Sequence, residues 1–465
     1  MITLDTHNIT LEGLGKDHGL DIKEAYQAYG QQLATAVSAL WQNPSQPGAW
    51  RDWLILANDT QLIEDINRYA KSIHGQFDHL IIVGIGGSAL GPLAAFEALL
   101  PAYWNERTHE QRQGKPKYYF VDNVDPDKLY DLLQVVDIKR TLVNVITKSG
   151  TTSETMAGYL WLKAELEKAV GTENVAKHLV MTTDPEKGLL RKIATEEGII
   201  AFPVPADVGG RYSEFSSVGL VPAAILGISL EEFCKGMKDL TPSLQSTDMQ
   251  TNPAMQGALI QYLCYQKGQH ISVLMPYAAK LASTADWYVQ LWAESLGKKV
   301  NLQGQVVHEG PTPHKAVGVT DQHSQVQLFN EGPFDKIITF VRLGQFEHHL
   351  TIPNLYPENP DLNYLGNQDF GKLLQAEADA TRASLTKNGK ANITLTLPKL
   401  DAYHFAQLLF LLEVQTALMG SLLNIDPFNQ PGVELGKQYT YALMGRPGFE
   451  NLKDEASGKI PQTAL

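Results

Sequence analysis

Two segments of the chain combine residue types that bind phosphate groups. The first runs from Gly84 to Ser88, follows the apolar run His79–Val83 and leads into an Ala- and Leu-rich stretch. The apolar run is typical of a buried parallel strand, and the stretch after it is typical of a helix. Glycines at such a turn let the backbone pack tightly and expose N–H groups at a helix N-terminus, where phosphate binds. This segment therefore predicts a small phosphorylated ligand.

The second segment, Thr147–Thr155, is rich in hydroxyl groups and follows the apolar run Leu142–Ile146. Hydroxyls and backbone N–H groups can surround a phosphate, and Lys148 adds a cation beside them. The alternative is an ordinary helix N-cap, because Ser and Thr favour that position. One hydroxyl satisfies a cap, and this segment has several more. Phosphate binding is therefore the favoured interpretation.

Neither segment matches a nucleotide-binding motif. The P-loop pattern Gly-x-x-x-x-Gly-Lys-Ser/Thr is absent, and Ala89 stands where the dinucleotide pattern Gly-x-Gly-x-x-Gly has its last residue. Dinucleotide binding is therefore the weaker alternative for this turn.

Two charged residues have sequence neighbours that suit catalysis. Arg211 follows Gly209 and Gly210, which allow a sharp turn, and a guanidinium presented there could stabilise developing negative charge. A surface ion pair is the alternative. Glu294 lies among apolar residues near the end of an expected helix, where desolvation would raise its proton affinity and make it a base near neutral pH. A solvated glutamate on an amphipathic helix is the more common case.

Two later segments are polar but carry no metal-binding pattern. His314 and His323 lie nine positions apart, so they are not a helical metal pair, and no His-Glu-x-x-His motif is completed. Either histidine could transfer protons, or it could be an ordinary loop residue. The segment Phe428–Lys437 places an Asn, Gln430 and Lys437 around a Pro-Gly turn, which suits contacts to hydroxyl groups. A helix-terminating turn is the alternative.

The amino-acid composition narrows the classes of molecule that the protein is expected to bind. The formal net charge is −13, from 38 basic and 51 acidic residues, which argues against general affinity for nucleic acid or anionic membranes. The two cysteines lie in no metal-ligand spacing and fit a reducing cytoplasm. We identify no signal peptide and no apolar run near the roughly 18 residues needed to span a bilayer. A cytoplasmic protein is expected.

Alternating strands and helices must position these segments. Strands alternating with helices imply right-handed βαβ units and a parallel sheet, and a chain of 465 residues predicts two large units. Helical stretches are expected at 281–297, 369–387 and 402–424. The expected strands form two series: Leu80–Val83, Tyr118–Val121, Leu142–Ile146, Leu179–Met181 and Ile199–Val204, and then Ile271–Met275, Ile337–Val341 and Ile393–Leu397.

These segments and their order along the chain resemble those of the glucose-6-phosphate isomerase family, over about residues 75 to 440. Val208–Ser213 and Phe428–Lys437 carry the most specific part of the resemblance. It implies an α/β fold of two sugar-isomerase (SIS) domains, each a parallel sheet flanked by helices in three layers. The implied divisions are a helical N-terminal extension (1–75), the first SIS domain (76–240), the second SIS domain (241–436) and a C-terminal extension (437–465).

The same resemblance implies interconversion of glucose 6-phosphate and fructose 6-phosphate by a homodimer that needs no metal and no cofactor. Glu294 would move a proton between C2 and C1, and Arg211 would stabilise the cis-enediol(ate) intermediate. Lys437 and His323 would act in ring opening, and the other subunit could donate His323. The remaining implied residues bind the sugar phosphate: Gly87, Ser88, Thr147, Lys148, Ser149, Thr151, Thr152, Gly210, Gln290 and Gln430.

One departure and two alternatives accompany the resemblance. Longer members commonly have an aromatic residue where this chain has Gly150, which leaves the shape of the loop open. A non-catalytic sugar-phosphate sensor would keep the phosphate-binding turns but would have no use for Glu294, Arg211, His323 and Lys437. An isomerase that also accepts mannose 6-phosphate is the other alternative.

Overall fold

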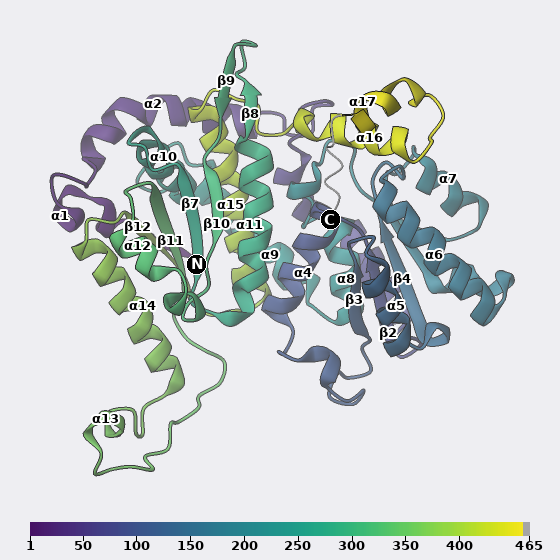
Figure 1. The fold of residues 1–465 in the computed structure, drawn as a ribbon, viewed down its shortest axis with the longest axis horizontal. Helices are drawn as coiled ribbons and strands as arrows, with labels where there is room; N and C mark the ends of the chain where they lie inside the picture. Colours follow the sequence, from purple (N-terminus) through teal and green to yellow (C-terminus); the bar gives the residue numbers. More distant parts are fainter. Residues whose placement is uncertain (459–465) are drawn as a thin grey trace.

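The computed structural model describes residues 1–458, and its framework is two separate β-sheets with helices packed on and between them (Figure 1). The first sheet is entirely parallel, in the order β3-β2-β4-β5-β6. Its strands are β2 (His79–Val83), β3 (Lys117–Val121), β4 (Thr141–Ile146), β5 (Leu179–Thr183) and β6 (Ile200–Pro203).

The second sheet has the order β1-β12-β11-β7-β10, and only β1 is antiparallel. A separate two-stranded hairpin projects from the surface beside it (Figure 1). The strands of the sheet are β1 (Thr3–Asp5), β7 (Ile271–Pro276), β10 (Thr312–Lys315), β11 (Lys336–Leu343) and β12 (Asn392–Leu397), and those of the hairpin are β8 (Lys298–Val300) and β9 (Val306–Glu309).

Helices separate most of the strands, and the final helices α16 and α17 lie over the first sheet's half of the molecule (Figure 1). The helices are α1 (Leu11–Leu14), α2 (Ile22–Trp41), α3 (Thr60–Ser72), α4 (Gly87–Leu99), α5 (Pro126–Val135), α6 (Ser153–Val170), α7 (Leu189–Glu196), α8 (Ser217–Leu226), α9 (Leu230–Gln245), α10 (Pro253–Gln266), α11 (Ala282–Leu296), α12 (Val326–Glu331), α13 (Pro360–Asn363), α14 (Phe370–Lys387), α15 (Ala402–Leu422), α16 (Glu434–Leu443) and α17 (Lys453–Gly458).

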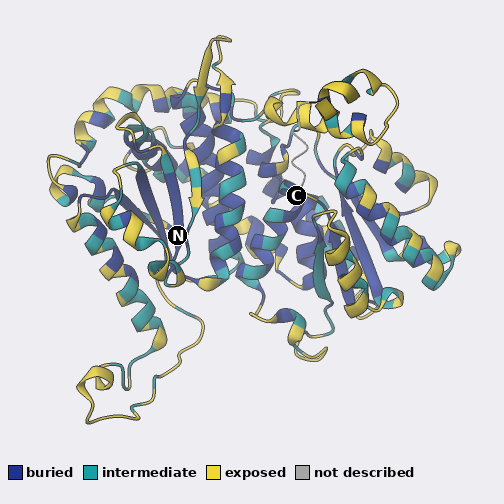
Figure 2. Cartoon of the chain, viewed as in Figure 1, coloured by how far each residue is buried: buried dark blue, intermediate teal, exposed yellow. Residues whose placement is uncertain are grey.

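One continuous apolar core joins the two halves. It contains residues from both sheets and from α4, α8, α9, α11 and α15, and α4 packs directly on α11. Two smaller apolar clusters cover the other faces of the first and second sheets. Figure 2 accordingly shows buried residues concentrated between the sheets and exposed ones on the outer helices. Parallel strands of this kind are buried on both faces of the sheet, which explains why they appear in the sequence as continuous apolar runs.

The predicted fold class and all eight predicted strands are confirmed. The sequence-based interpretation missed β1, β10 and the β8–β9 hairpin, each of which has at most four residues per strand. β1 belongs to the expected helical extension but pairs with β12 at a sheet edge. β10 contains Pro313 and follows Gly310 and Pro311, so its sequence is typical of a loop. It forms a strand at the opposite edge, where proline is tolerated.

Helix α15 corrects the expectation that no apolar segment is long enough to cross a membrane. It has 21 residues and a mean hydropathy of 1.4 over its most apolar window, which meets the length and composition needed. However, 94% of that window is buried inside the protein. Contacts with α9, α10 and α11 surround the helix, so its apolar character belongs to the core.

Two carboxyl groups lie unpaired within this core. Glu413 on α15 is fully buried, and neither of its carboxyl oxygens has a hydrogen-bond partner within residues 1–458. Glu214, before α8, is also buried and leaves Oε2 without a partner. Burial raises the pKa of both carboxyls well above the usual value, and an ionised Glu214 would raise that of Glu413 further. The protonated form is therefore favoured in the folded protein.

Replacement of Glu413 by Gln should weaken the pH dependence of stability. The folded protein holds a proton that the unfolded chain releases above about pH 4.3, so the wild type loses stability as pH rises toward the raised pKa. Gln cannot titrate, so the free energy of unfolding of the variant should fall less steeply with pH. The difference from the wild type should be up to about 1.4 kcal/mol per pH unit. Urea unfolding between about pH 5 and 8 measures the difference.

Glu64→Gln, on the exposed side of α3, is the matched control and should keep the wild-type slope. Equal slopes for Glu413→Gln and the wild type would contradict a buried, protonated Glu413.

Candidate functional site

The glycine-rich turn after β2 lies against the Gly-Gly-Arg loop. A Cβ atom at Gly87 would lie only 2.1 Å from the carbonyl oxygen of Gly210 and 2.9 Å from the backbone nitrogen of Arg211. Gly86 has a φ of +58°, and a Cβ there would lie 2.9 Å from Nε2 of Gln290. The absence of side chains at Gly86 and Gly87 therefore brings together residues that are far apart in the sequence.

This turn also opens α4 without a side-chain cap. Gly86 occupies the N-cap position and has no side chain that could accept the first N–H groups. Ser88 is half-buried in the first turn of the helix. The positive end of a helix dipole therefore meets a surface of backbone N–H and hydroxyl groups, which suits a phosphate.

Arg211 is the centre of the site and is 1% exposed. Its Nε donates to Oγ of Ser295 at 2.7 Å, and its Nη1 donates to Oε1 of Gln430 at 2.7 Å. Nη2 donates to the backbone oxygens of Pro427 at 2.6 Å and Asn429 at 3.2 Å. The guanidinium therefore joins its own loop to the end of α11 and to the segment after α15.

Glu294 is the carboxylate nearest this guanidinium. Its Oε2 lies 3.4 Å from Nη1 of Arg211, and its Oε1 accepts a hydrogen bond of 3.1 Å from Nε2 of Gln290. The Glu294 side chain is 33% exposed, so the expected apolar surroundings were wrong. The neighbouring apolar residues of α11 face the core, whereas Glu294 lies on the helix face that meets Arg211 and the glycine turn.

Lys298 belongs to the same cluster, although the sequence did not single it out. Its Nζ donates to the backbone oxygens of Glu294 at 2.5 Å and Asn429 at 2.8 Å. Burial, with the nearby charge of Arg211, lowers the pKa of Lys298 to about 8. Its place four residues after Glu294, just beyond the end of α11, was the available signal.

The hydroxyl-rich turn after β4 keeps its side chains out of the helix cap. Thr152 is the N-cap residue of α6 but makes no capping hydrogen bond, and its Oγ1 lies 3.3 Å from Oγ1 of Thr147. Thr151 donates from both its backbone N–H and its hydroxyl to Oγ of Ser149, at 3.2 and 2.9 Å. The helix-cap alternative therefore does not account for these hydroxyls.

The shape of this turn depends on Gly150. Its φ is +66°, and a Cβ there would lie 2.4 Å from the backbone nitrogen of Leu190. The start of α7 thus occupies the space that a side chain at this position would need. The turn has no room for the aromatic residue of the longer family members.

Lys148 points toward the loop before Gly209. Its Nζ donates to the backbone oxygens of Ala206 at 2.8 Å and Val208 at 3.0 Å, and it lies 4.6 Å from the ring centre of Trp50. Burial lowers the pKa of this lysine. Lys148 therefore links the hydroxyl-rich turn to the loop that carries Arg211.

Lys437 lies in the first half of α16, whose residues are mostly exposed. Its Nζ pairs with Oε1 of Glu434 at 2.8 Å. The same helix reaches the hydroxyl-rich turn, because the hydroxyl of Tyr441 donates to the backbone oxygen of Thr151 at 3.3 Å. Helix α16 therefore lies beside the predicted phosphate turn.

The two histidines lie on the second half of the chain. His314 is in β10, with Nε2 2.6 Å from Oε1 of Gln325. His323 is exposed at the end of a short 3-10 helix, Thr320–His323. Its neighbour Gln322 binds residues of α14. Within residues 1–458, no hydrogen bond or ion pair joins His323 to Glu294 or Lys437.

The structure thus brings Gly87, Gly210, Arg211, Glu294, Gln290 and Gln430 into one cluster, with the hydroxyl-rich turn linked to it through Lys148. It does not bring His323 to that cluster within one chain. The described part of the chain also has no group of three or more His, Cys, Asp or Glu residues placed to hold a metal ion.

Comparison with known sequences covers most of the chain. The sequence profile described as phosphoglucose isomerase matches residues 55–455. A glucose-6-phosphate isomerase of Carboxydothermus hydrogenoformans is 44% identical over 393 residues, 84% of each chain. One from Rubrobacter xylanophilus is 40% identical over 451 residues, covering 96% of this chain and 99% of the relative.

Solved structures agree with the sequence matches. A hypothetical protein from Thermus thermophilus is 35% identical and has a TM-score of 0.86, covering 96% of this chain and all of that one (100%). A glucose-6-phosphate isomerase from Chlamydia trachomatis shares the fold at a TM-score of 0.79 and 21% identity, over 94% and 87% of the two chains. From the profile match and the close relatives, the chain belongs to the phosphoglucose isomerase family.

Proposed function

We propose that this chain isomerises glucose 6-phosphate and fructose 6-phosphate in glycolysis and gluconeogenesis, with the roles below for its residues. The observation that carries the assignment of roles is the contact between Glu294 and Arg211 beside the glycine turn of α4. A base and a fixed cation then lie together next to a surface that suits phosphate.

In this proposal, Glu294 moves the proton between C1 and C2 of the open-chain sugar. The Glu294 carboxylate is held by Gln290 and is partly exposed, so substrate can reach it. Arg211 stabilises the negative charge that develops on the enediolate oxygens. Its hydrogen bonds to Ser295, Gln430 and two backbone oxygens hold the guanidinium in place, so little reorganisation accompanies the reaction.

The phosphate of the sugar binds the two turns at the ends of β2 and β4. These contribute backbone N–H groups and hydroxyls from Ser88, Thr147, Ser149, Thr151 and Thr152, and Lys148 and Gly87 belong to the same proposed site. Because the phosphate is remote from C1 and C2, its binding energy positions the reacting carbons. Gly210 and Gln430 contact the sugar chain, which lies between the two ends.

Ring opening is assigned to Lys437 and to a His323 donated by a second copy of the chain. His323 is exposed, and it is not joined to the catalytic cluster of its own chain, which supports a homodimer. A cytoplasmic location and the absence of nucleic-acid, membrane and cofactor requirements are parts of the same proposal.

A coupled assay tests the function. Purified protein with fructose 6-phosphate and a chelator should produce glucose 6-phosphate. A protein that binds sugar phosphate but shows no turnover would instead be a sensor. Rates with glucose 6-phosphate and mannose 6-phosphate measured side by side define how selective the enzyme is for the aldose.

Glu294→Gln should abolish turnover. Gln keeps the size of the side chain but cannot accept the proton, and loss of a positioned base costs about 10²- to 10⁴-fold in rate. Binding of the sugar phosphate, measured by calorimetry, should change little. The control is Glu186→Gln, at an exposed position after β5. A wild-type rate in Glu294→Gln would remove Glu294 as the base.

Ser149→Ala should raise the Michaelis constant more than it lowers the turnover number. The hydroxyl is expected to bind the phosphate, which is remote from the reacting carbons. Steady-state kinetics in both directions separate the two constants, with Ser38→Ala on the surface of α2 as control. A fall in turnover number without a change in the Michaelis constant would place Ser149 at the reacting end.

Gly87→Ala should impair both stability and activity. The new methyl group would meet the backbone of Gly210, which cannot rotate away as a side chain can. Overpacking of this kind costs about 1–3 kcal/mol, and here it displaces Arg211. Thermal unfolding and the coupled assay measure the two effects. Gly30→Ala, where a Cβ has open space, is the control, and equal behaviour of both variants would contradict the contact.

A further inference from the structure

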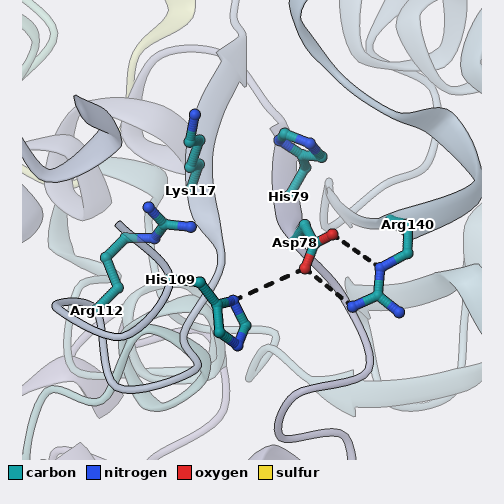
Figure 3. A pocket seen from close by; sticks show the side chains of 6 residues that line it. All are labelled: Asp78, His79, His109, Arg112, Lys117 and Arg140. Atoms are coloured by element: carbon teal, nitrogen blue, oxygen red, sulfur yellow. Dashed lines mark hydrogen bonds and ion pairs between the residues drawn. The ribbon is translucent and has the colours of Figure 1, made fainter. Parts of the chain in front are cut away.

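A polar cavity lies at the end of the first sheet where β2, β3 and β4 begin. Its volume is about 500 Å³. Residues at the starts of the three strands and a loop before β3 form its walls (Figure 3). The six lining residues are Asp78, His79, His109, Arg112, Lys117 and Arg140.

The sheet itself sets the positions of the cationic groups. His79 and Lys117 are register partners on β2 and β3, so their side chains leave the same face of the sheet. Arg140 directly precedes β4, next to the first residue of β2. Figure 3 shows Arg112 and Lys117 on one side of the cavity, with Asp78 and Arg140 on the other.

Among the six described lining residues, Asp78 has the only carboxylate, and this carboxylate is already paired. Arg140 donates from Nε and Nη2 to the two oxygens of Asp78, at 2.8 and 2.9 Å. These bonds lower the pKa of Asp78, and His109 lies 3.9 Å away. Asp137, the nearest other acid before β4, accepts a hydrogen bond from the backbone N–H of Lys139. The negative charge of Asp78 is therefore compensated by Arg140.

Arg112 and Lys117 have no such partner. Arg112 is 4% exposed, and its Nε donates to the backbone oxygen of Lys115 at 3.1 Å, with Nη1 directed at that of Arg107. Within residues 1–458, no ion pair to a carboxylate is formed by Arg112 or Lys117. The charge of Asp78 acts on Arg112 without forming an ion pair with it, and burial, the larger effect, lowers the pKa of Arg112.

A further unsatisfied group faces the same place. His79 is 8% exposed, and its Nδ1 is buried without a hydrogen-bond partner in the described chain. A buried ring nitrogen without a partner is unusual, and it adds a polar group to the wall of the cavity. Among residues 1–458, the cavity thus places two cations that form no ion pair beside a buried ring nitrogen that has no hydrogen-bond partner.

We propose that this cavity binds a phosphate group, either free inorganic phosphate or the phosphate of a small metabolite. Phosphate neutralises Arg112 and Lys117 together, because a guanidinium pairs with two phosphate oxygens and an ammonium provides a compact third contact. The protein carries a net charge of −13, so this concentration of cations is local to the cavity.

Binding here does not compete with the sugar phosphate. Strand β2 runs from this cavity to Gly84, and β4 runs from it to Thr147, so the two sites lie at opposite ends of the same strands. The inference is independent of which sugar phosphate the catalytic cluster takes.

Calorimetry with inorganic phosphate and the full-length protein tests the proposal. The wild type should bind two phosphate ions per chain. Lys117→Gln should weaken one of these about tenfold, as expected for loss of a charged hydrogen bond, and leave the other unchanged. Lys387→Gln, an exposed lysine of α14, removes the same charge elsewhere and should match the wild type.

Asp78→Asn is a second variant that keeps the test decisive if Lys117→Gln does not fold. It removes the carboxylate of the cavity, so the same phosphate should bind more tightly. Titration with glycerol 3-phosphate distinguishes the sources: tighter binding than inorganic phosphate identifies a phosphorylated metabolite, and weaker binding identifies the free ion. The proposal is overturned if Lys117→Gln and Lys387→Gln bind alike. It is also overturned if Ser149→Ala, which alters the catalytic turn, removes all phosphate binding.

Discussion

A buried guanidinium is the constraint on which the site depends. Arg211 is almost completely removed from water, and such a charge is tolerated only when hydrogen bonds replace its hydration. Ser295 and Gln430 supply two of these bonds and backbone oxygens the others. These groups come from the end of α11 and the segment after α15, so both must meet the Gly-Gly-Arg loop. Satisfying one charge therefore assembles the cluster to which we assign catalysis.

The glycine turn at the start of α4 allows the first half of the chain to join this cluster. Gly87 lies in backbone contact with Gly210, and Gly86 lies against Gln290, which in turn holds Glu294. Side chains at either glycine would separate the glycine turn from Gln290 and Arg211, and so from Glu294. The same closeness explains why α4 and α11, from different halves of the chain, pack directly on each other.

The parallel first sheet separates two kinds of polar surface. All of its strands point the same way. The loops after β2 and β4 therefore lie at one end of the strands, and the residues before the strands lie at the other end. The end after β2 and β4 carries glycines and hydroxyl groups, which can bind an anion through dipoles. The opposite end carries Arg112, Lys117 and Arg140, which would bind one through full charges.

The sequence alone determined the alternation of strands and helices, and it singled out Arg211, Glu294 and the two turns that we propose to bind phosphate. Apolar periodicity and the residue types at turns are local properties. The sequence could not show that Glu294 lies beside Arg211, that Lys298 holds the backbone of Glu294, or that β10 forms a strand, since these depend on contacts between distant segments. The cavity around Arg112 was likewise invisible, because its residues are scattered from Asp78 to Arg140. Only the tertiary structure decided them, because the register of three parallel strands and the hydrogen-bond needs of buried charges select which distant residues meet.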